Sequence, residues 1–183
     1  MPIDKHVIDT NVLLVASAAH DASPFPEDAT PVEKAELRKQ VLDWVMDFDK
    51  SQRRIVLDYG WEIAGEYRGD NRRDKLTEQD YGMQLVLQLW STGRFCGFLL
   101  EHNADGSARI AHAALDPVIT DVADRKMVAA VLAGGCNAGG CNLVNACDTD
   151  WYDWQTAMEA ADVHVEQLIH DWCHAKWLAK QMR

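Results

Sequence analysis

The sequence contains no run of about 20 apolar residues, the length that a membrane-spanning helix needs. Its start also lacks the pattern of a secretory signal peptide, because Asp4 and Lys5 follow Met-Pro-Ile and Asp9 interrupts the first apolar segment. We therefore expect no association with a membrane and a cytoplasmic location.

Cysteine is scarce, and its spacing excludes a disulfide framework. The five cysteines are an odd number at irregular intervals, which suits a reducing compartment: Cys96, Cys136, Cys141, Cys147 and Cys173. Three of them form a Cys-x4-Cys-x5-Cys series, Cys136, Cys141 and Cys147, without the paired CxxC spacing or a nearby histidine that zinc sites use. Buried thiols are the simpler interpretation, and whether the three bind anything stays open.

Basic residues are outnumbered, with 18 Lys and Arg against 29 Asp and Glu and a net charge of −11. This balance counts against nucleic-acid binding, which depends on cations that contact phosphates. The basic residues are clustered, however, as at Arg53-Arg54, between Arg68 and Lys75, and at Arg125-Lys126. An acidic chain can still present one basic face.

The composition of residues 1–183 is typical of one globular domain, with 48% hydrophobic and 26% charged residues. Strand and helix patterns alternate along it. We predict strands over 5–14, 54–57 and 142–146, with weaker candidates over 95–100, 108–113 and 163–165. We predict helices over 31–50, 61–69, 78–90, 121–133, 151–161 and 169–180, the first capped by Thr30, Pro31 and Glu33. This alternation predicts an α/β fold with a mostly parallel sheet covered on both faces.

Acidic residues recur where the predicted strands end. Asp9 lies in the first apolar segment, and further acids follow the second strand, open the 121–133 helix and follow the 142–146 strand: Asp58, Glu62, Glu66, Asp121, Asp124, Asp148, Asp150 and Asp153. Each acid has an ordinary alternative role, as a turn residue, a helix cap or a solvated surface charge. The carboxyl ends of parallel strands meet at one edge of a sheet, however, so these acids are expected to lie together.

Carboxylates packed together repel one another unless they are protonated or share a cation. Oxygen ligands alone favour Mg²⁺ or Mn²⁺ over zinc. A cation held in this way can activate water and stabilise phosphodiester cleavage. The sequence therefore predicts a Mg²⁺ or Mn²⁺ site built around Asp9.

Four segments resemble the motifs of the PIN-domain family, and the match covers most of the chain. Val7–Leu13 (Val-Ile-Asp-Thr-Asn-Val-Leu) looks like the family's opening strand and turn. Ile63–Tyr67 and Asp121–Ala129 are similar to its second and third motifs, and Leu143–Trp151 to its fourth. Cys147 and Ala146 stand where the family usually has Thr or Ser, and the middle, about 69–115, is longer than a minimal member needs.

The resemblance implies a three-layer α/β/α sandwich and a Mg²⁺- or Mn²⁺-dependent endoribonuclease, often the toxin of a toxin–antitoxin pair. It implies that the metal ligands and catalytic acids are Asp9, Glu66, Asp124 and Asp148, supported by Asp150 or Asp121. It also implies that Thr10 and Asn11 organise the turn after Asp9, and that Arg125 and Lys126 neutralise substrate phosphate unless they form a solvated helix face. The implied partners are an RNA substrate, an antitoxin protein and a second copy of the chain.

Other functions fit parts of the pattern. A phosphatase of the haloacid dehalogenase type also opens with a strand and an Asp, but it needs a second Asp where this chain has Asn11. A nuclease acting on single-stranded DNA would use the same site. A PIN-like binding or assembly module would suit the acidic charge and the seven tryptophans. His170 and His174, four residues apart, lack a nearby third ligand, so we predict no metal there.

Overall fold

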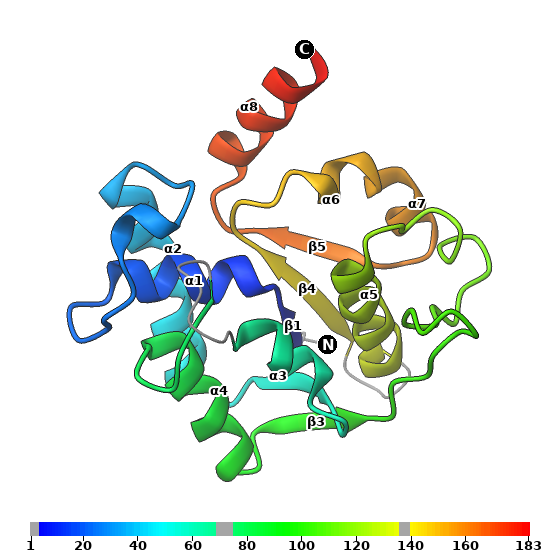
Figure 1. Ribbon diagram of the computed structural model, residues 1–183, viewed down its shortest axis with the longest axis horizontal. Coiled ribbons are helices and arrows are strands. Elements are labelled where there is room, and N and C mark those ends of the chain that lie inside the picture. Colours follow the sequence, from blue (N-terminus) through cyan, green and yellow to red (C-terminus); the bar gives the residue numbers. More distant parts are fainter. Residues whose placement is uncertain (1–3, 69–74, 136–139) are drawn as a thin grey trace.

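A five-stranded parallel sheet forms the centre of the molecule. In the computed structural model, which describes residues 4–68, 75–135 and 140–183, the strand order is β3-β2-β1-β4-β5 (Figure 1). The strands are β1 (Lys5–Ile8), β2 (Arg54–Asp58), β3 (Phe95–Phe98), β4 (Cys141–Asn145) and β5 (His164–Gln167). Every pairing between neighbours is parallel, so all five strands end at the same edge of the sheet.

Helices fill the connections between these strands. They are α1 (Thr10–Ala19), α2 (Ala35–Lys50), α3 (Glu62–Tyr67), α4 (Tyr81–Ser91), α5 (Val122–Gly135), α6 (Asp150–Asp153), α7 (Gln155–Ala160) and α8 (His170–Gln181), with a 3-10 helix at Glu27–Ala29. The predicted α/β class with a parallel central sheet is confirmed. Figure 1 shows α8 extending away from the sheet to the C-terminus.

The two faces of the sheet are covered by different helices. Two adjacent residues of β1 show this, because their side chains contact different helices. The ammonium of Lys5 donates to the carbonyl of Gly134 in α5 at 2.7 Å. The next side chain, His6, meets the rings of Trp44 and Phe48 in α2, with centroids 5.9 and 5.4 Å away. Successive side chains of a strand point to opposite faces, so α5 and α2 lie on opposite sides, consistent with an α/β/α sandwich.

The buried strands explain the architecture. Ile55, Val56 and Leu57 of β2 are at most 1% exposed, as expected for a strand covered on both faces. One hydrophobic core runs from Val7 to Ile169 and includes residues of every layer. Between α1 and α4 the helices touch so closely that a Cβ on Gly82 would lie 2.9 Å from Leu13 Cβ, which explains the glycine.

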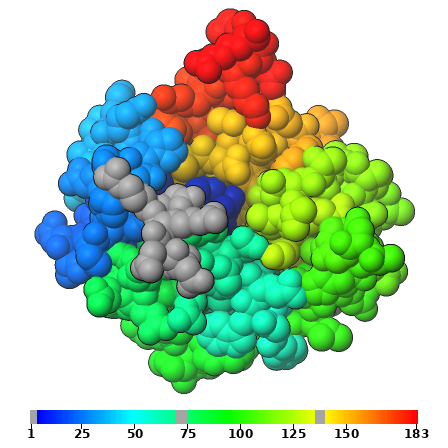
Figure 2. Space-filling model, viewed as in Figure 1, coloured from blue at the N-terminus to red at the C-terminus, as the bar shows by residue number. Residues whose placement is uncertain are grey.

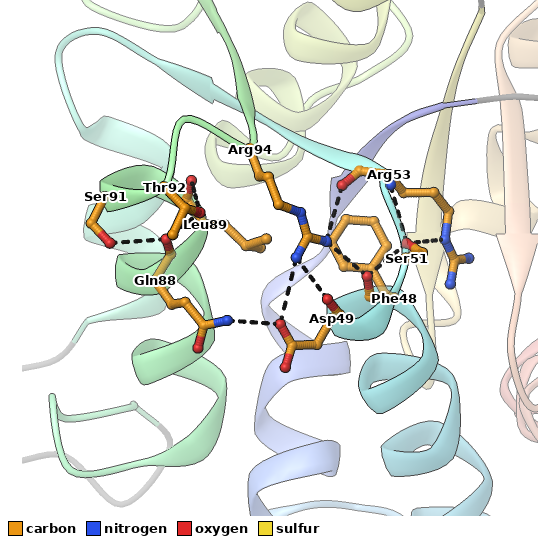
Figure 3. Close-up of polar contacts among 9 residues, drawn as sticks. All are labelled: Phe48, Asp49, Ser51, Arg53, Gln88, Leu89, Ser91, Thr92 and Arg94. Carbon is orange, nitrogen blue, oxygen red and sulfur yellow. Dashed lines mark hydrogen bonds and ion pairs between the residues drawn. The ribbon is translucent and has the colours of Figure 1, made fainter.

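The opposite edge of the sheet, where β2 and β3 begin, is fixed by Arg94 (Figure 3). Its guanidinium donates to the carbonyls of Asp49 at 2.6 Å, Phe48 at 3.0 Å and Arg53 at 3.2 Å. The carbonyls of Phe48 and Asp49 lie in the last turn of α2, where carbonyls have no amide partner within the helix, and that of Arg53 directly precedes β2. Arg94 thereby ties α2 to the starts of two strands and belongs to the scaffold.

The predicted strand over 5–14 is wrong beyond Ile8, because a helix begins at Thr10. The side chain of Asp9 caps that helix by accepting the amide N–H of Asn11 at 3.2 Å. Most of α1 is buried, including Val12, Leu13 and Val15, so its apolar residues show no single-face periodicity that separates it from a buried strand. The helix continues to Ala19.

Other element boundaries also differ from the predictions. The helix predicted from 31 begins at Ala35, because Thr30 and Glu33 form no capping box: Thr30 accepts the N–H of Val32, and Glu33 pairs with Lys176. The segment 108–113 is not a strand and contributes a single bridge, Ala108 to His102. The helix predicted over 151–161 is split into α6 and α7 at Trp154.

None of the helices in the described parts of the chain has the length and apolar composition to cross a bilayer.

Candidate metal centre at the carboxyl edge of the sheet

Asp9 is the first residue after β1 and sits where that strand turns into α1. Its side chain is almost fully buried, at 6% exposure for the residue. One carboxylate oxygen accepts from the amide of Asn11, and the other accepts from the indole Nε1 of Trp151 at 2.7 Å. Both oxygens therefore have fixed directions.

Asp148 lies in the turn after β4, and two asparagines hold that turn. Asn11 Oδ1 accepts the amide N–H groups of Ala146 at 2.8 Å and Cys147 at 3.1 Å. Asn145 Nδ2 donates to the carbonyl of Asp148 at 2.8 Å, and its Oδ1 accepts the N–H of Asp148 at 3.1 Å. Asn11 also donates to Asn145 at 2.9 Å, so the turn after β1 and the turn after β4 are locked together.

Asp124 comes from the first turn of α5, on the face of the sheet that this helix covers. It is 9% exposed. Asp121, just before the helix, accepts the N–H of Ala123 at 2.8 Å and of Asp124 at 3.2 Å, so it acts as the helix cap. The cap sets the direction in which α5 presents Asp124.

These three carboxylates meet. One oxygen from each of Asp9, Asp124 and Asp148 lies within 4.8 Å of the others. Among the described residues, none of the three forms an ion pair with a lysine or arginine. The arrangement could hold a metal ion, since shared coordination to a cation relieves the repulsion between buried acids.

The pKa values of the three carboxyl groups reflect their burial and this repulsion. Burial, together with the charge of Asp148, raises the pKa of Asp9 to about 7 even though Trp151 and Asn11 donate to it. Burial and the charges of Asp9 and Asp148 raise the pKa of Asp124 to about 8. Burial also raises the pKa of Asp148 above its ordinary value. Asp9 and Asp124 therefore bind protons near neutral pH, which a cation shared by the three carboxylates could replace.

Glu66, which the resemblance placed among the ligands, lies outside this group of three. Lys126 of α5 donates to Glu66 Oε1, and Lys75 lies 3.9 Å from Glu66 Oε2. Lys126 is also 3.9 Å from Glu62, whose carboxylate meets the imidazole of His102 at 3.0 Å. The structure thus gives Glu66 lysine partners, and it places Lys126 in an ion-pair network two residues beyond Asp124.

Asp150 is also outside the group of three, because it pairs with Lys180 of α8 at 2.5 Å and begins α6. Its amide N–H donates to Asp148 Oδ1 at 2.8 Å, so its backbone supports the site directly. Thr10 is the first residue of α1 and is partly exposed. Asp58, at the end of β2, caps α3 by accepting from Glu62 and Ile63.

From the sequence, Arg125 was expected either to neutralise substrate phosphate or to lie on a solvated helix face. In the structure it is buried and bonded within the protein. It is 7% exposed, and its guanidinium donates to the carbonyls of Ala108, Asp116 and Ile119 at 2.6–2.9 Å. It also pairs with the Asp116 carboxylate. Arg125 therefore anchors the segment between β3 and α5 to α5, and we leave it out of the proposed substrate contacts.

Two cysteines lie beside the carboxylates as free thiols. Burial and the neighbouring charge of Asp9 raise the pKa of Cys147, and burial raises the pKa of Cys173 to about 11. The Cys173 thiol donates to the carbonyl of Asp148 at 3.4 Å. Cys141 is a buried free thiol in β4, and Cys136, the third member of the spaced series, lies outside the described residues.

Three residues that build the site were not predicted from the sequence. Trp151 donates to Asp9, Asn145 holds Asp148, and the hydroxyl of the fully buried Tyr67 donates to the carbonyl of Ile8 at 2.7 Å. A polar Asn at the end of an apolar strand was the one available signal. The roles of Trp151 and Tyr67 depend on contacts between residues 142 and 59 positions apart.

The surface is hollowed on this side of the molecule. In Figure 2 the dark-blue N-terminal part of the chain is seen at the bottom of a hollow, framed by the yellow-green and gold segments that correspond to α5 and to the chain after β4. The segments that carry the three carboxylates thus surround an open recess.

Comparison with known proteins adds nothing to this geometry: no family model, no curated protein and no solved structure matches the chain.

Proposed function

We propose that the protein is a metal-dependent phosphodiester hydrolase, a nuclease whose cation is held by Asp9, Asp124 and Asp148. The observation that carries the proposal is the meeting of these three buried carboxylates, within 4.8 Å, at the carboxyl edge of a parallel sheet. That edge is where α/β proteins place their ligands. The order of motifs, and the PIN-domain resemblance they carry, supports hydrolysis of RNA in particular.

The proposed cation is Mg²⁺ or Mn²⁺. All three donor groups are carboxylates, the ligands that hard divalent cations select. The thiol of Cys147, the residue before Asp148, has a raised pKa and stays protonated, which makes it a poor ligand for zinc. The donor set therefore fits a hard cation.

When bound, such a cation supplies activation of water and stabilisation of the charge that develops on phosphorus oxygens. The chain's own residues set the geometry. Trp151 and Asn11 orient the two oxygens of Asp9, and Asn145 fixes the main chain of Asp148 on both sides. Positioning by groups that are themselves locked is what transition-state stabilisation requires.

Lys126 is the proposed phosphate contact. Its side chain is 15% exposed and already faces two carboxylates, Glu62 and Glu66, beside the helix turn that carries Asp124. A phosphate oxygen is a third anionic partner for the same ammonium. The acidic composition predicts that binding depends on this local contact and on the cation rather than on the overall charge. An antitoxin partner and a dimer remain predictions of the resemblance.

The test compares wild type with Asp9→Asn on labelled RNA and on single-stranded DNA of the same sequence, with Mg²⁺, Mn²⁺ or chelator. Asp43→Asn is the matched control, because Asp43 is exposed on α2 and pairs only with Lys39 among the described residues. We expect cleavage of RNA that needs the cation, falls at least a hundredfold in Asp9→Asn and is unchanged in Asp43→Asn. Cleavage that survives Asp9→Asn in a clean preparation contradicts the proposal.

The same pair of variants separates a nuclease from a non-catalytic module. A wild-type protein that binds Mn²⁺ but cleaves neither nucleic acid would be a binding module. Growth arrest on expression, relieved by Asp9→Asn and not by Asp43→Asn, would identify the activity as toxic in the cell.

A further inference from the structure

A second cavity, of about 290 Å³, lies between the α6–α7 segment and β5, and none of the three carboxylates lines it. Its walls include four aromatic rings, those of Trp151, Tyr152, His164 and His170, and two amides, those of Gln155 and Gln167. The other lining residues are Met158, Val163 and Val165, which are apolar, and Glu159. The volume is at the lower end for small-molecule sites, so the cavity suits a ligand of one or two rings.

The lining has the chemistry that recognises a nucleobase. Aromatic side chains offer faces for a flat heterocycle, and the rings of Tyr152 and His170 stand 6.1 Å apart at 71° to each other, forming a corner. Gln155 Nε2 donates to Glu159 and Gln167 Oε1 accepts from Asn145, so the groups left for the edge of a base are the Gln155 oxygen as acceptor and the Gln167 nitrogen as donor. A purely apolar ligand would contact the rings but would form no hydrogen bonds with the amides.

The charges around the cavity select against phosphate. The described lining residues include Glu159 but no lysine or arginine. The two lining imidazoles each face a carboxylate, His164 that of Asp162 at 3.5 Å and His170 that of Asp171 at 3.2 Å. An anionic group at this rim would be repelled, so an uncharged base or nucleoside is favoured over a nucleotide.

Two hydrogen-bonded connections lead from the cavity wall to the carboxylates. Trp151 lines the cavity and donates to Asp9 at 2.7 Å. Gln167 also lines it and accepts from Asn145 at 2.6 Å, and the same Asn145 amide donates to the carbonyl of Asp148. A ligand that shifts either wall residue therefore acts on two of the three carboxylates.

We propose that this cavity binds an uncharged nucleobase or nucleoside, and that its occupancy changes the affinity of the carboxylate site for its cation. The first half stands on the cavity alone; the second half rests on the metal site proposed above. The base has two sources, a free nucleoside or one base of a strand held at the carboxylates, and the test separates them.

Binding is measured first without metal, by calorimetry with adenosine, guanosine, cytidine and uridine. We expect at least one nucleoside to bind one site per chain with a Kd below about 1 mM, and more tightly than its 5′-monophosphate. Indole and p-cresol, rings without the full hydrogen-bonding edge of a base, are expected to bind at least tenfold more weakly. Absence of binding by all four nucleosides, or equal binding of the bare rings, overturns the assignment.

Tyr152→Leu removes one ring of the cavity and keeps an apolar side chain. We expect it to weaken nucleoside binding about tenfold or more. Tyr59→Leu is the matched control, because Tyr59 is 61% exposed beyond β2, two strands from β4 on the other side of β1. Equal losses in the two variants, with both folded by circular dichroism, contradict the location.

Coupling is measured by titrating Mn²⁺ with and without saturating nucleoside. We expect a change in Mn²⁺ affinity of about fivefold or more in wild type, and the same factor in nucleoside affinity with saturating Mn²⁺. Nucleoside binding without coupling overturns the second half alone, whereas a wild type that binds no Mn²⁺ overturns the proposed function.

The source of the base is decided by oligonucleotides in chelator. If the ligand is a base of the strand, an oligonucleotide with one abasic position should bind more weakly than the intact one, and Tyr152→Leu should erase the difference. If the ligand is a free nucleoside, it should bind equally in the presence and absence of the intact oligonucleotide.

Discussion

The indole Nε1 of Trp151 donates a 2.7 Å hydrogen bond to Asp9 Oδ2, joining the helix after β4 to the end of β1. Trp151 is 1% exposed, so this donor has exchanged water for one carboxylate. A hydrogen bond of this kind favours the ionised carboxylate and offsets part of the cost of burying its charge. Through this contact the orientation of Asp9 depends on the helix that follows the neighbouring strand β4.

Trp151→Phe should therefore weaken both the fold and the metal site. Removing the donor leaves Asp9 without one of its partners, and we expect unfolding to become easier by about 1–3 kcal/mol at pH 8. Urea denaturation and Mn²⁺ titration measure the two effects. The control is Trp154→Phe, the neighbouring partly buried indole, whose ring centroid lies 5.6 Å from that of Trp151. Equal effects in both variants would show that ring packing, not the hydrogen bond, matters.

Stability without metal should fall as the pH rises. The pKa values of Asp9, about 7, and Asp124, about 8, both lie above the ordinary value of 3.8, so the folded state binds more protons than the unfolded state between these limits. The free energy of unfolding then decreases from about pH 4 to about pH 8, by at most about 1.4 kcal/mol per pH unit for each titrating group. Thermal unfolding in chelator measures it, and saturating Mn²⁺ should remove most of the loss. A melting temperature that rises with pH over this range in chelator would be inconsistent with three repelling carboxylates.

Asn11→Ala should uncouple the two turns that carry Asp9 and Asp148. The substitution removes the acceptor of two amide N–H groups and the donor to Asn145. We expect a loss of stability of about 2 kcal/mol or more and a weaker Mn²⁺ affinity. Asn103→Ala, in a surface loop where Asn103 bonds to Ser107, is the control and should change neither property by much. Unchanged Mn²⁺ affinity in Asn11→Ala would mean that the turns hold their positions independently.

Arg125 and Lys126 are adjacent but should respond differently to the same substitution. Arg125→Gln removes guanidinium bonds to three carbonyls, two of them buried, and should lower the stability by about 3 kcal/mol or more. Lys126→Gln should cost less stability and should weaken nucleic-acid binding, with a smaller dependence of affinity on salt. Denaturation and oligonucleotide binding at two salt concentrations separate the two roles. A loss of binding in Arg125→Gln that exceeds its unfolded fraction would assign Arg125 to the substrate after all.

The sequence predicted the parts of the fold that local chemistry controls. The β-branched run that ends at Leu57 was recognisable, and so was the helix predicted over 121–133, which runs two residues further, to Gly135. The boundary at Asp9 was not, because α1 is buried on most sides and its apolar residues fit a buried strand equally well. The start of α2 was missed because Glu33 reaches Lys176, 143 residues away.

In the candidate site, too, some residues could be predicted from the sequence and others could not. Asp9, Asp124 and Asp148 follow strand ends or open a helix, so topology alone brought them together. Glu66 fits the sequence pattern equally well, yet in the structure Lys126 engages its side chain. That pairing depends on how α3 and α5 face each other, which no local pattern records. Trp151, one of the seven tryptophans that suited an interaction module, is instead a core residue that donates a hydrogen bond to Asp9.

The most direct test of the central claim is calorimetric titration of Mn²⁺ at pH 7.5 into wild type, Asp9→Asn, Asp124→Asn, Asp148→Asn and the Asp43→Asn control. The three carboxylates predict one saturable cation per chain in wild type and in Asp43→Asn, with release of protons seen as a dependence of the heat on the buffer. Each of the other three variants should lose affinity by at least tenfold. No saturable binding in wild type, or binding that survives all three substitutions, would contradict the account.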